Sequence, residues 1–401
     1  MIYQAAGYAP FLLLAWLVYW WCCGSGQTRS LWLGSTSLAW LLWLAATSAS
    51  PQLGLAYVSG MLALAAIVFV WAGRLRRSPS RLGMWAGILV ALLPLTGFKY
   101  LLPTLPSASA ASWAIPLGIS YYSFKHVHFL IESQRGKFAD AAWRDYLAYI
   151  CFFPMYAAGP IERYGNLASQ FEDVSWSWAE LSYGLERILL GCFKKLLLAD
   201  VLLHGVALSP NALNQQQALA LPWYLLLFGC GMRFLQTYLD FSGYTDMAIG
   251  TARLFGIRLM ENFRAPLLKP NLAEFWRTWH ISLSSFARDY VYLPTLGRWR
   301  HPTWALLLTM LSIGLWHSGN AGWLLWGLHH GLGLVVLSRW QQWAQARPRL
   351  RQLRATTGWR IAGTLATWVY VSLGYALTVY PESWLHAPGL YLRIVSLGIP
   401  A

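Results

Sequence analysis

The chain has 401 residues, of which 57% are hydrophobic and 11% charged, and its formal net charge is +15. Soluble domains are about one quarter charged, so this composition excludes an ordinary soluble protein and predicts a polytopic membrane protein. The basic residues are scattered among short loops, so we expect no nucleic-acid partner. An all-α fold is expected, because backbone amides in lipid need internal hydrogen bonds and the alternation of a barrel strand is missing.

Apolar segments suited to a bilayer recur along the chain, and a helical span needs about 20 mostly apolar residues. In chain order, the predicted segments are 10–23, 31–48, 53–73, 82–104, 113–131, 145–158, 180–205, 218–239, 242–257, 303–317, 321–338, 361–380 and 388–400. With re-entrant pieces included, we expect about 11 to 13 membrane segments. No soluble domain or internal repeat stands out, so a single membrane domain is predicted over residues 1–401.

Arginine-rich loops predict the orientation. Residues 74–81 carry four arginines and residues 339–360 carry six, whereas residues 1–9 hold no Lys or Arg. Cytoplasmic loops of membrane proteins are enriched in Lys and Arg. We therefore expect a multi-pass membrane protein with its N-terminus outside.

Residues 258–302 are too polar and too basic to span a bilayer, yet they are rich in Phe, Trp and Tyr. Such a stretch can re-enter the protein interior where other helices cover it. Five cysteines lie in or beside apolar segments without metal-ligand spacing, and no HExxH pattern occurs. We expect no bound metal.

The stretch "TYLDFSGYTDMAIG" places Asp240, Ser242 and Asp246 in a predicted membrane segment. Polar groups at membrane depth are costly and often functional. Two interpretations stay open here. The side chains either join helices by hydrogen bonds, or they line a substrate path.

His317 follows Trp316 in the apolar stretch "LSIGLWHSGNAGWLLW". A buried imidazole tends to stay neutral, and a neutral imidazole accepts a proton from a hydroxyl, which is the task of a general base. No Ser- or Cys-centred nucleophile motif accompanies it. A structural histidine remains the alternative.

His280 lies in "EFWRTWHISLSSFARDYVY", together with Trp276, Arg277, Arg288 and Asp289. One interpretation is an interfacial aromatic belt with arginines that reach toward the headgroups. The other is a pocket for a large anionic donor, with arginine for phosphate and aromatic rings for an apolar part.

Six segments resemble one known family, in order and in sequence. They are "PLGISYYSFKHVHFLIESQRG", "FFPMYAAGPIERY", "DFSGYTDMAIG", "FGIRLMENFRAP", "EFWRTWHISLSSFARDYVYLP" and "GLWHSGNAGWLLWGLHHG". Together they resemble the membrane-bound O-acyltransferase family, bacterial branch, between about residues 113 and 340. The chain departs from the family pattern at Ser318, where glycine often follows the motif histidine.

The resemblance implies a ring of tilted helices around a central tunnel and acyl transfer from a cytoplasmic thioester to an extracytoplasmic hydroxyl. It implies catalytic roles for His317 and His280. No bound cofactor is expected, since the acyl thioester is a co-substrate: acetyl-coenzyme A or an acyl or D-alanyl carrier protein. The expected partners are that donor and an extracytoplasmic polymer acceptor. A periplasmic acyltransferase that passes the acyl group on to the polymer is a further option.

Two groups of the family compete as the nearest match. "DFSGYTDMAIG" and "AAGPIERY" resemble the polysaccharide O-acetylases, whereas "FARDYVY" and the modest length resemble the D-alanyl transferases. We favour acetylation of a secreted polysaccharide over D-alanyl transfer. A transporter or export subunit is the alternative of another class; discontinuous, symmetry-related helices would support it.

Overall fold

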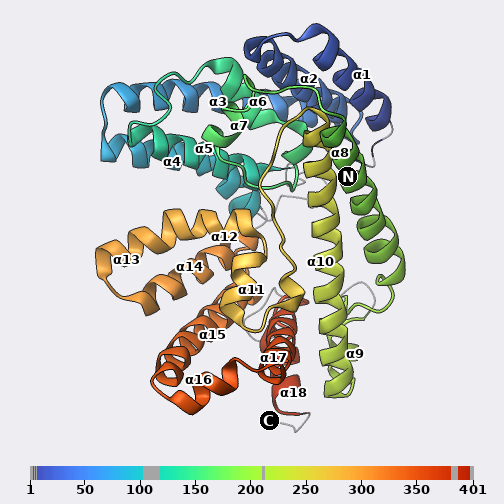
Figure 1. Ribbon diagram of the computed structural model, residues 1–401, viewed down its shortest axis with the longest axis vertical. Coiled ribbons are helices and arrows are strands. Elements are labelled where there is room, and N and C mark those ends of the chain that lie inside the picture. The colour runs from blue at the N-terminus through green and yellow to red at the C-terminus, as the bar shows by residue number, and fades with distance from the viewer. Residues whose placement is uncertain are drawn as a thin grey trace. The chain divides into compact units, whose positions relative to one another are not determined.

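The chain forms helices and no strand in its described residues, which are 3, 5, 7–102, 118–209, 213–380 and 387–397 of a computed structural model (Figure 1). This confirms the all-α prediction. Three stretches in these ranges are long and apolar enough to cross a membrane: Pro51–Arg77, Arg81–Leu101 and Ala321–Gln345. The ring around a tunnel and the number of membrane segments stay predictions.

Two compact units divide the chain. The first comprises Met1–Gly191 and Tyr244–Met260, and the second comprises Cys192–Gly243 and Glu261–Ala401. The prediction of a single domain over residues 1–401 stays a prediction. Residues 103–117, where one predicted segment begins, and 398–400, where another ends, lie outside the described ranges.

The first unit is built around packed membrane-length helices. Here α2 packs against α3 and α6, and α5 packs against α3 and α4 (Figure 1). Its elements are α1 (Tyr8–Cys22), α2 (Gly26–Ala46), α3 (Pro51–Arg77), α4 (Arg81–Thr96), the π-helix η2 (Gly97–Leu101), α5 (Ile119–Gln134), α6 (Trp143–Cys151), η4 (Phe153–Met155), α7 (Tyr164–Ala168), α8 (Trp178–Cys192, whose last residue falls in the second unit) and the end of α10 (Trp223–Leu254).

The second unit holds most of the predicted site. The stretch from 258 to 302 contains short helices, none of membrane-spanning length, as its polarity predicts. The elements are η5 (Phe193–Leu202), α9 (Gln215–Leu219), most of α10, η6 (Pro266–Leu268), α11 (Leu272–Thr278), α12 (Ile281–Ala287), η7 (Arg288–Tyr292), α13 (Leu293–Trp299), α14 (Pro302–His317), α15 (Ala321–Gln345), α16 (Pro348–Arg354), α17 (Thr357–Tyr375) and α18 (Ala387–Val395).

The sequence predicts separate segments at 218–239 and 242–257, and this is wrong. One continuous helix, α10, runs through both. The gap between the two predicted segments lies at Asp240 and Phe241, and neither residue removes a backbone N–H as proline does. A glycine inside a helix costs only about 1 kcal/mol, which tertiary packing readily overcomes.

A close helix pair, α14 and α15, positions His317. A Cβ added at Gly314 would lie 2.4 Å from the carbonyl oxygen of Trp323, and one at Gly327 would lie 2.6 Å from that of Met310. The two backbones therefore approach each other through paired glycines, as small residues allow in membrane helices. This contact fixes the turn between the helices, which begins directly after His317.

Replacing Gly327 by alanine is expected to destabilise the protein by about 1–3 kcal/mol, since the methyl group has to push backbone rather than a flexible side chain. The thermal unfolding temperature and acyl transfer should both fall. Gly297→Ala in α13 is the matched control, because nothing lies within 4 Å of its added Cβ. Equal unfolding temperatures for the two variants would contradict the packing argument.

Candidate active site

Asn262 holds His280 and the start of α12 in place. The side-chain oxygen Oδ1 of Asn262 lies 3.1 Å from Nδ1 of His280 and accepts from the Ser282 hydroxyl at 2.9 Å and the Ser282 backbone N–H at 3.2 Å. Its backbone carbonyl accepts from the N–H of Ile281 at 2.9 Å. Asn262 is completely buried. The Asn262 side chain therefore contacts residues that lie eighteen and twenty positions later in the sequence.

These contacts decide which nitrogen of His280 carries the proton. A backbone N–H only donates, so the Asn262 atom that faces Ser282 is the oxygen. An amide oxygen only accepts, so Nδ1 of His280 must donate to it. In the neutral ring the other nitrogen, Nε2, then carries the lone pair. His280 therefore presents an acceptor, not a donor, at Nε2.

Burial keeps His280 in this neutral form. The residue is 3% exposed, and its removal from water lowers the pKa well below the usual range, with a further lowering from nearby His317. His280 also adopts the left-handed conformation, with φ 44° and ψ 54°. Non-glycine residues rarely do so, and such strain persists where surrounding contacts enforce it, often at functional sites.

His317 is the last residue of α14 and is partly exposed. Its ring stacks on Trp323 with centroids 4.2 Å apart and an interplanar angle of 16°. The unsatisfied carbonyls at a helix C-terminus favour a positive charge. His317 therefore lies at the end of the helix where a positively charged group is favoured.

Trp316 contacts both predicted histidines. Its ring centroid is 6.0 Å from that of His280 and 4.6 Å from that of His317. The structure thus brings together three predicted site residues that are 36 and 37 positions apart in the sequence.

The aromatic cluster continues beyond His317 toward His330 of α15. Trp326 contacts both His317 and His330, at centroid distances of 5.4 and 4.6 Å. Trp276, predicted to bind substrate, packs edge-on against His330 at 5.2 Å. The indole N–H of Trp276 is buried without a hydrogen-bond partner among the described residues, which makes it a candidate donor to a substrate oxygen.

The predicted charged residues have other surroundings. Arg277 on α11 is exposed. Arg288 and Asp289 on η7 form an ion pair with each other at 2.8 Å, largely in the open. The roles of these three side chains toward a substrate stay predictions.

Asp240 and Ser242 lie on the part of α10 in the second unit. The carboxylate of Asp240 pairs with Lys195 of η5, and Lys195 also binds Asp200 at 2.6 Å. This network corresponds to the helix-joining interpretation. Ser242 is buried, and its hydroxyl has no hydrogen-bond partner within the described ranges. It therefore remains available to line a polar path.

Asp246 belongs to the first unit, whereas the other predicted site residues belong to the second. It is buried and pairs with Arg187 of α8 at 2.5 Å. A buried charge paired in this way holds two helices together. A part for Asp246 in substrate binding stays a prediction.

No group of three His, Cys, Asp or Glu side chains is arranged to hold a metal ion in the part of the chain that the structure describes. The cysteines within it are free thiols. The chemistry available at the site is that of imidazole rings, an amide, a hydroxyl and indole N–H groups.

Asn262 is the main site residue that sequence reasoning missed. It lies in "FGIRLMENFRAP", one of the segments that carry the family resemblance, but nothing in that stretch indicates that it contacts a histidine eighteen residues later. Trp323, which stacks on His317, was also missed. The five residues "SGNAG" separate it from His317, and it lies in the first turn of α15, where its ring stacks on the imidazole.

The helices, the apolar spans and the polar centre define a polytopic, all-helical membrane protein. Residues 11–379 match the model of the membrane-bound O-acyltransferase family, so the chain belongs to that family and lies in a membrane. This confirms the resemblance seen in the motifs.

Several curated relatives show what the chain is similar to. It is 36% identical over 288 residues to a probable alginate O-acetylase of Pseudomonas syringae pv. tomato, covering 67% of this chain and 54% of that protein. It is 30% identical over 260 residues to a peptidoglycan O-acetyltransferase of Helicobacter pylori, covering 55% and 47%. It is 29% identical over 274 residues to a teichoic acid D-alanyltransferase of Bacillus subtilis, covering 65% and 67%. The match spans about half the length of the first of these relatives.

Proposed function

We propose that the protein transfers an acyl group from a thioester donor to a hydroxyl of an extracytoplasmic polysaccharide. The observation that carries this proposal is the contact of both His280 and His317 with the ring of Trp316, with His280 held as a neutral acceptor by Asn262. Two oriented imidazoles in a largely apolar cluster suit proton transfer while little water is present to hydrolyse a thioester.

His317 is the general base in this proposal. It accepts the proton of the acceptor hydroxyl as the oxygen attacks the thioester carbonyl carbon. The tetrahedral intermediate collapses, the carbon–sulfur bond breaks, and the imidazolium returns the proton to the leaving thiolate. The products are an ester and a free thiol, so atoms and charges balance without a covalent enzyme intermediate.

His280 binds substrate through Nε2 in this scheme. As an acceptor it receives a hydrogen bond from an N–H or O–H of a substrate. In this tautomer His280 does not donate a hydrogen bond from Nε2 to the oxyanion of the tetrahedral intermediate. A negative oxygen needs N–H groups, and the buried indole N–H of Trp276 offers one.

The distribution of charge and the family support a membrane location and an orientation for the protein. We assign it to the bacterial inner membrane with the N-terminus outside and the arginine-rich loops at 74–81 and 339–360 in the cytoplasm. The donor, acetyl-coenzyme A or a carrier-protein thioester, approaches from the cytoplasm. The acceptor polymer approaches from outside, through a periplasmic acyltransferase in one version. Acetyl is favoured, since the alginate O-acetylase match has higher identity than the D-alanyltransferase match.

Radiolabelled acyl transfer in membrane vesicles tests the proposal. Vesicles that contain the protein and a polysaccharide acceptor are supplied with either acetyl-coenzyme A or a D-alanyl carrier protein. We expect label in polymer from acetyl-coenzyme A. Label from the D-alanyl donor alone would replace acetylation by D-alanyl transfer.

His301→Ala is the matched control for the histidine variants. His301 is exposed and precedes the opposite end of α14, with no capping hydrogen bond from its side chain. Its replacement should leave transfer unchanged. No thioester turnover from either donor, with folded protein and acceptor present, would contradict the enzyme and favour a transporter.

A further inference from the structure

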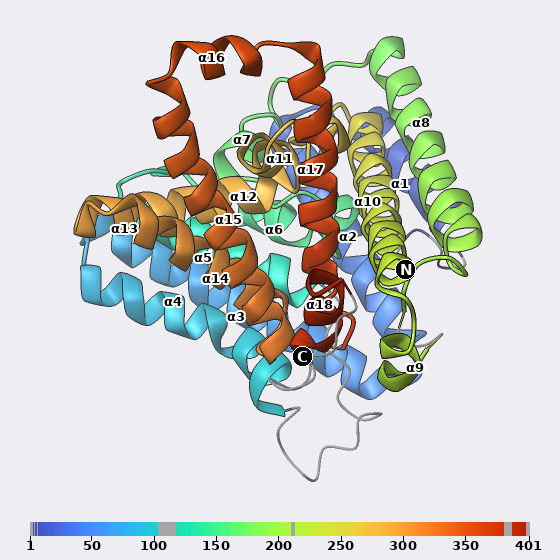
Figure 2. The same ribbon diagram turned by 90° about the horizontal axis from the view of Figure 1, so that it is seen from below.

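The second unit contains a pocket between the C-terminal end of α15 and the N-terminal end of α17, where α16 connects the two helices. Figure 2 shows these two helices diverging toward α16, with α11 nearby. The pocket has a volume of about 1300 Å³. Pockets for small ligands are usually about 300–1000 Å³, so this one suits a larger molecule. It involves neither His280 nor His317.

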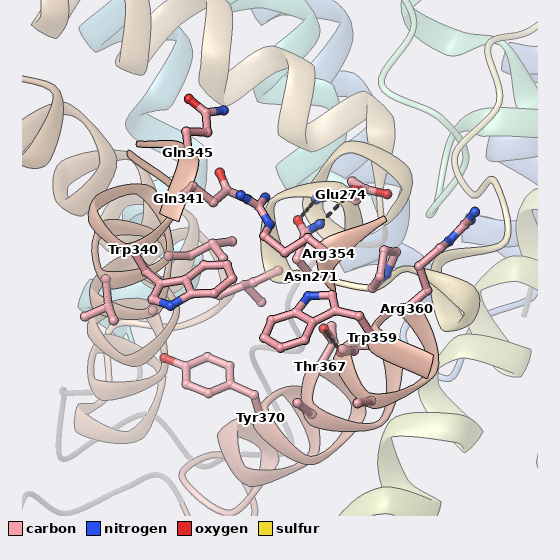
Figure 3. Close-up of a pocket in the computed structure, with 18 of the residues that line it drawn as sticks. Asn271, Glu274, Trp340, Gln341, Gln345, Arg354, Trp359, Arg360, Thr367 and Tyr370 are labelled. Atoms are coloured by element: carbon pink, nitrogen blue, oxygen red, sulfur yellow. Dashed lines mark hydrogen bonds between the residues drawn. The ribbon is translucent and has the colours of Figure 1, made fainter. Parts of the chain in front are cut away.

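One end of the pocket is aromatic and basic. Figure 3 shows Trp340 of α15 and Trp359 of α17 at this end of the pocket. The two indoles are parallel, with centroids 5.8 Å apart, and the guanidinium of Arg354 lies 5.0 Å from the Trp340 ring. Paired tryptophans beside arginine are typical of the membrane–water interface.

Three arginines line this end: Arg351 and Arg354 on α16 and Arg360 at the start of α17. None forms an ion pair within the described part of the chain, and residues 339–360 contain no acidic residue. The carboxylate that lines the pocket, Glu274, instead accepts from Asn271 at 2.6 Å. The charge of the pocket is therefore complementary to an anion.

The other end of the pocket is lined mainly by aliphatic side chains. Leu332 and Val336 follow the face of α15 below Trp340, over about 12 Å of helix. Ala366 of α17 lies on the pocket wall, whereas Gly363 packs closely against the backbone carbonyl of Pro270, which also lines the pocket. The hydroxyl of Tyr370, beside Gly333 at this end, already donates to the carbonyl of His329, and the aliphatic side chains offer no hydrogen bond. A donor arm that carries amides would lose its water there without replacement, whereas an alkyl chain would not.

We propose that this pocket binds an anionic phospholipid, with its phosphate at Arg351 and Arg354 and an acyl chain along Leu332 and Val336. The lipid fills the opening between α15 and α17 and ties α16 to the membrane surface. It is a bound lipid rather than a substrate, and its site is separate from the histidines. The same helix, α15, carries Trp323 and Trp326 of the active-site cluster at its other end.

Native mass spectrometry of the full chain in detergent tests this site, with phosphatidylglycerol and phosphatidylcholine as probes. We expect at least tenfold tighter binding of phosphatidylglycerol. The double variant R351Q/R354Q should bind it about 30-fold more weakly, because each arginine near an anionic lipid contributes roughly a fivefold factor. The control R339Q/R349Q removes the same charge from exposed positions outside the pocket and should lose less than about threefold.

A second pair of variants tests the apolar end without changing charge. Ala366→Trp fills the pocket and should displace the lipid, whereas Leu365→Trp, on an exposed neighbouring position outside the pocket, should not. Equal losses in the two arginine pairs, or no preference between the lipids, would overturn the proposal. Displacement of phosphatidylglycerol by coenzyme A or inorganic phosphate would do so too, since it would assign the pocket to a soluble phosphate compound.

Discussion

Replacing His317 by alanine is expected to lower acyl transfer at least a hundredfold, because a general base typically contributes a factor of about 10² to 10⁴. The loss should fall on kcat rather than on KM, since the ring accepts its proton only as the oxygen attacks. Initial rates of label transfer at saturating donor, in vesicles with equal amounts of folded protein, measure it.

His317→Gln separates chemistry from packing. Glutamine keeps a planar polar side chain against Trp323 but does not accept a proton at neutral pH. It should be as inactive as the alanine variant while its thermal unfolding matches the wild type. A glutamine variant that transfers at a normal rate would show that His317 is not the base.

Replacing Asn262 by leucine is expected to lower transfer about a hundredfold through misplacement of His280, although Asn262 itself is a positioning residue. The change leaves buried donors of His280 and Ser282 without their common acceptor, and each costs about 1–3 kcal/mol. Ser282→Ala is the control. It removes one donor and keeps the contact between Asn262 and His280, so its loss should stay within about threefold.

Asn262→Asp gives a readout that a purely structural role would not produce. The aspartate oxygen still accepts from His280, but its negative charge favours the imidazolium and raises the pKa of His280. In the wild type this pKa is lowered by burial, so His280 stays neutral throughout the neutral range. In the variant, transfer should be lost as the pH falls through the raised pKa and recover at higher pH.

The pH profile of kcat/KM measures this shift. The acidic limb of Asn262→Asp should move to higher pH than that of the wild type, and Ser282→Ala should leave it in place. Identical acidic limbs in all three proteins would mean that the protonation of His280 does not matter for the reaction.

Composition and periodicity alone predicted the helical membrane fold, because lipid leaves the backbone few alternatives. The same reasoning recognised that 258–302 does not span, since its charge density is local information. It failed at α10, where it predicted two segments separated at residues 240–241. Helix continuity there depends on neighbouring contacts, such as the pair of Asp240 with Lys195, that no window of sequence contains.

The motifs identified both histidines, Trp316 and Trp276, because imidazole and indole in apolar stretches are visible residue by residue. The role of His280 was not visible. Its tautomer depends on Asn262, eighteen positions away, and on a backbone N–H of Ser282 that identifies the amide oxygen. Sequence thus determined the membrane class, the family and the side chains of the candidate site. Only the tertiary structure decided which nitrogen is protonated, because hydrogen bonds between distant residues form when the chain folds.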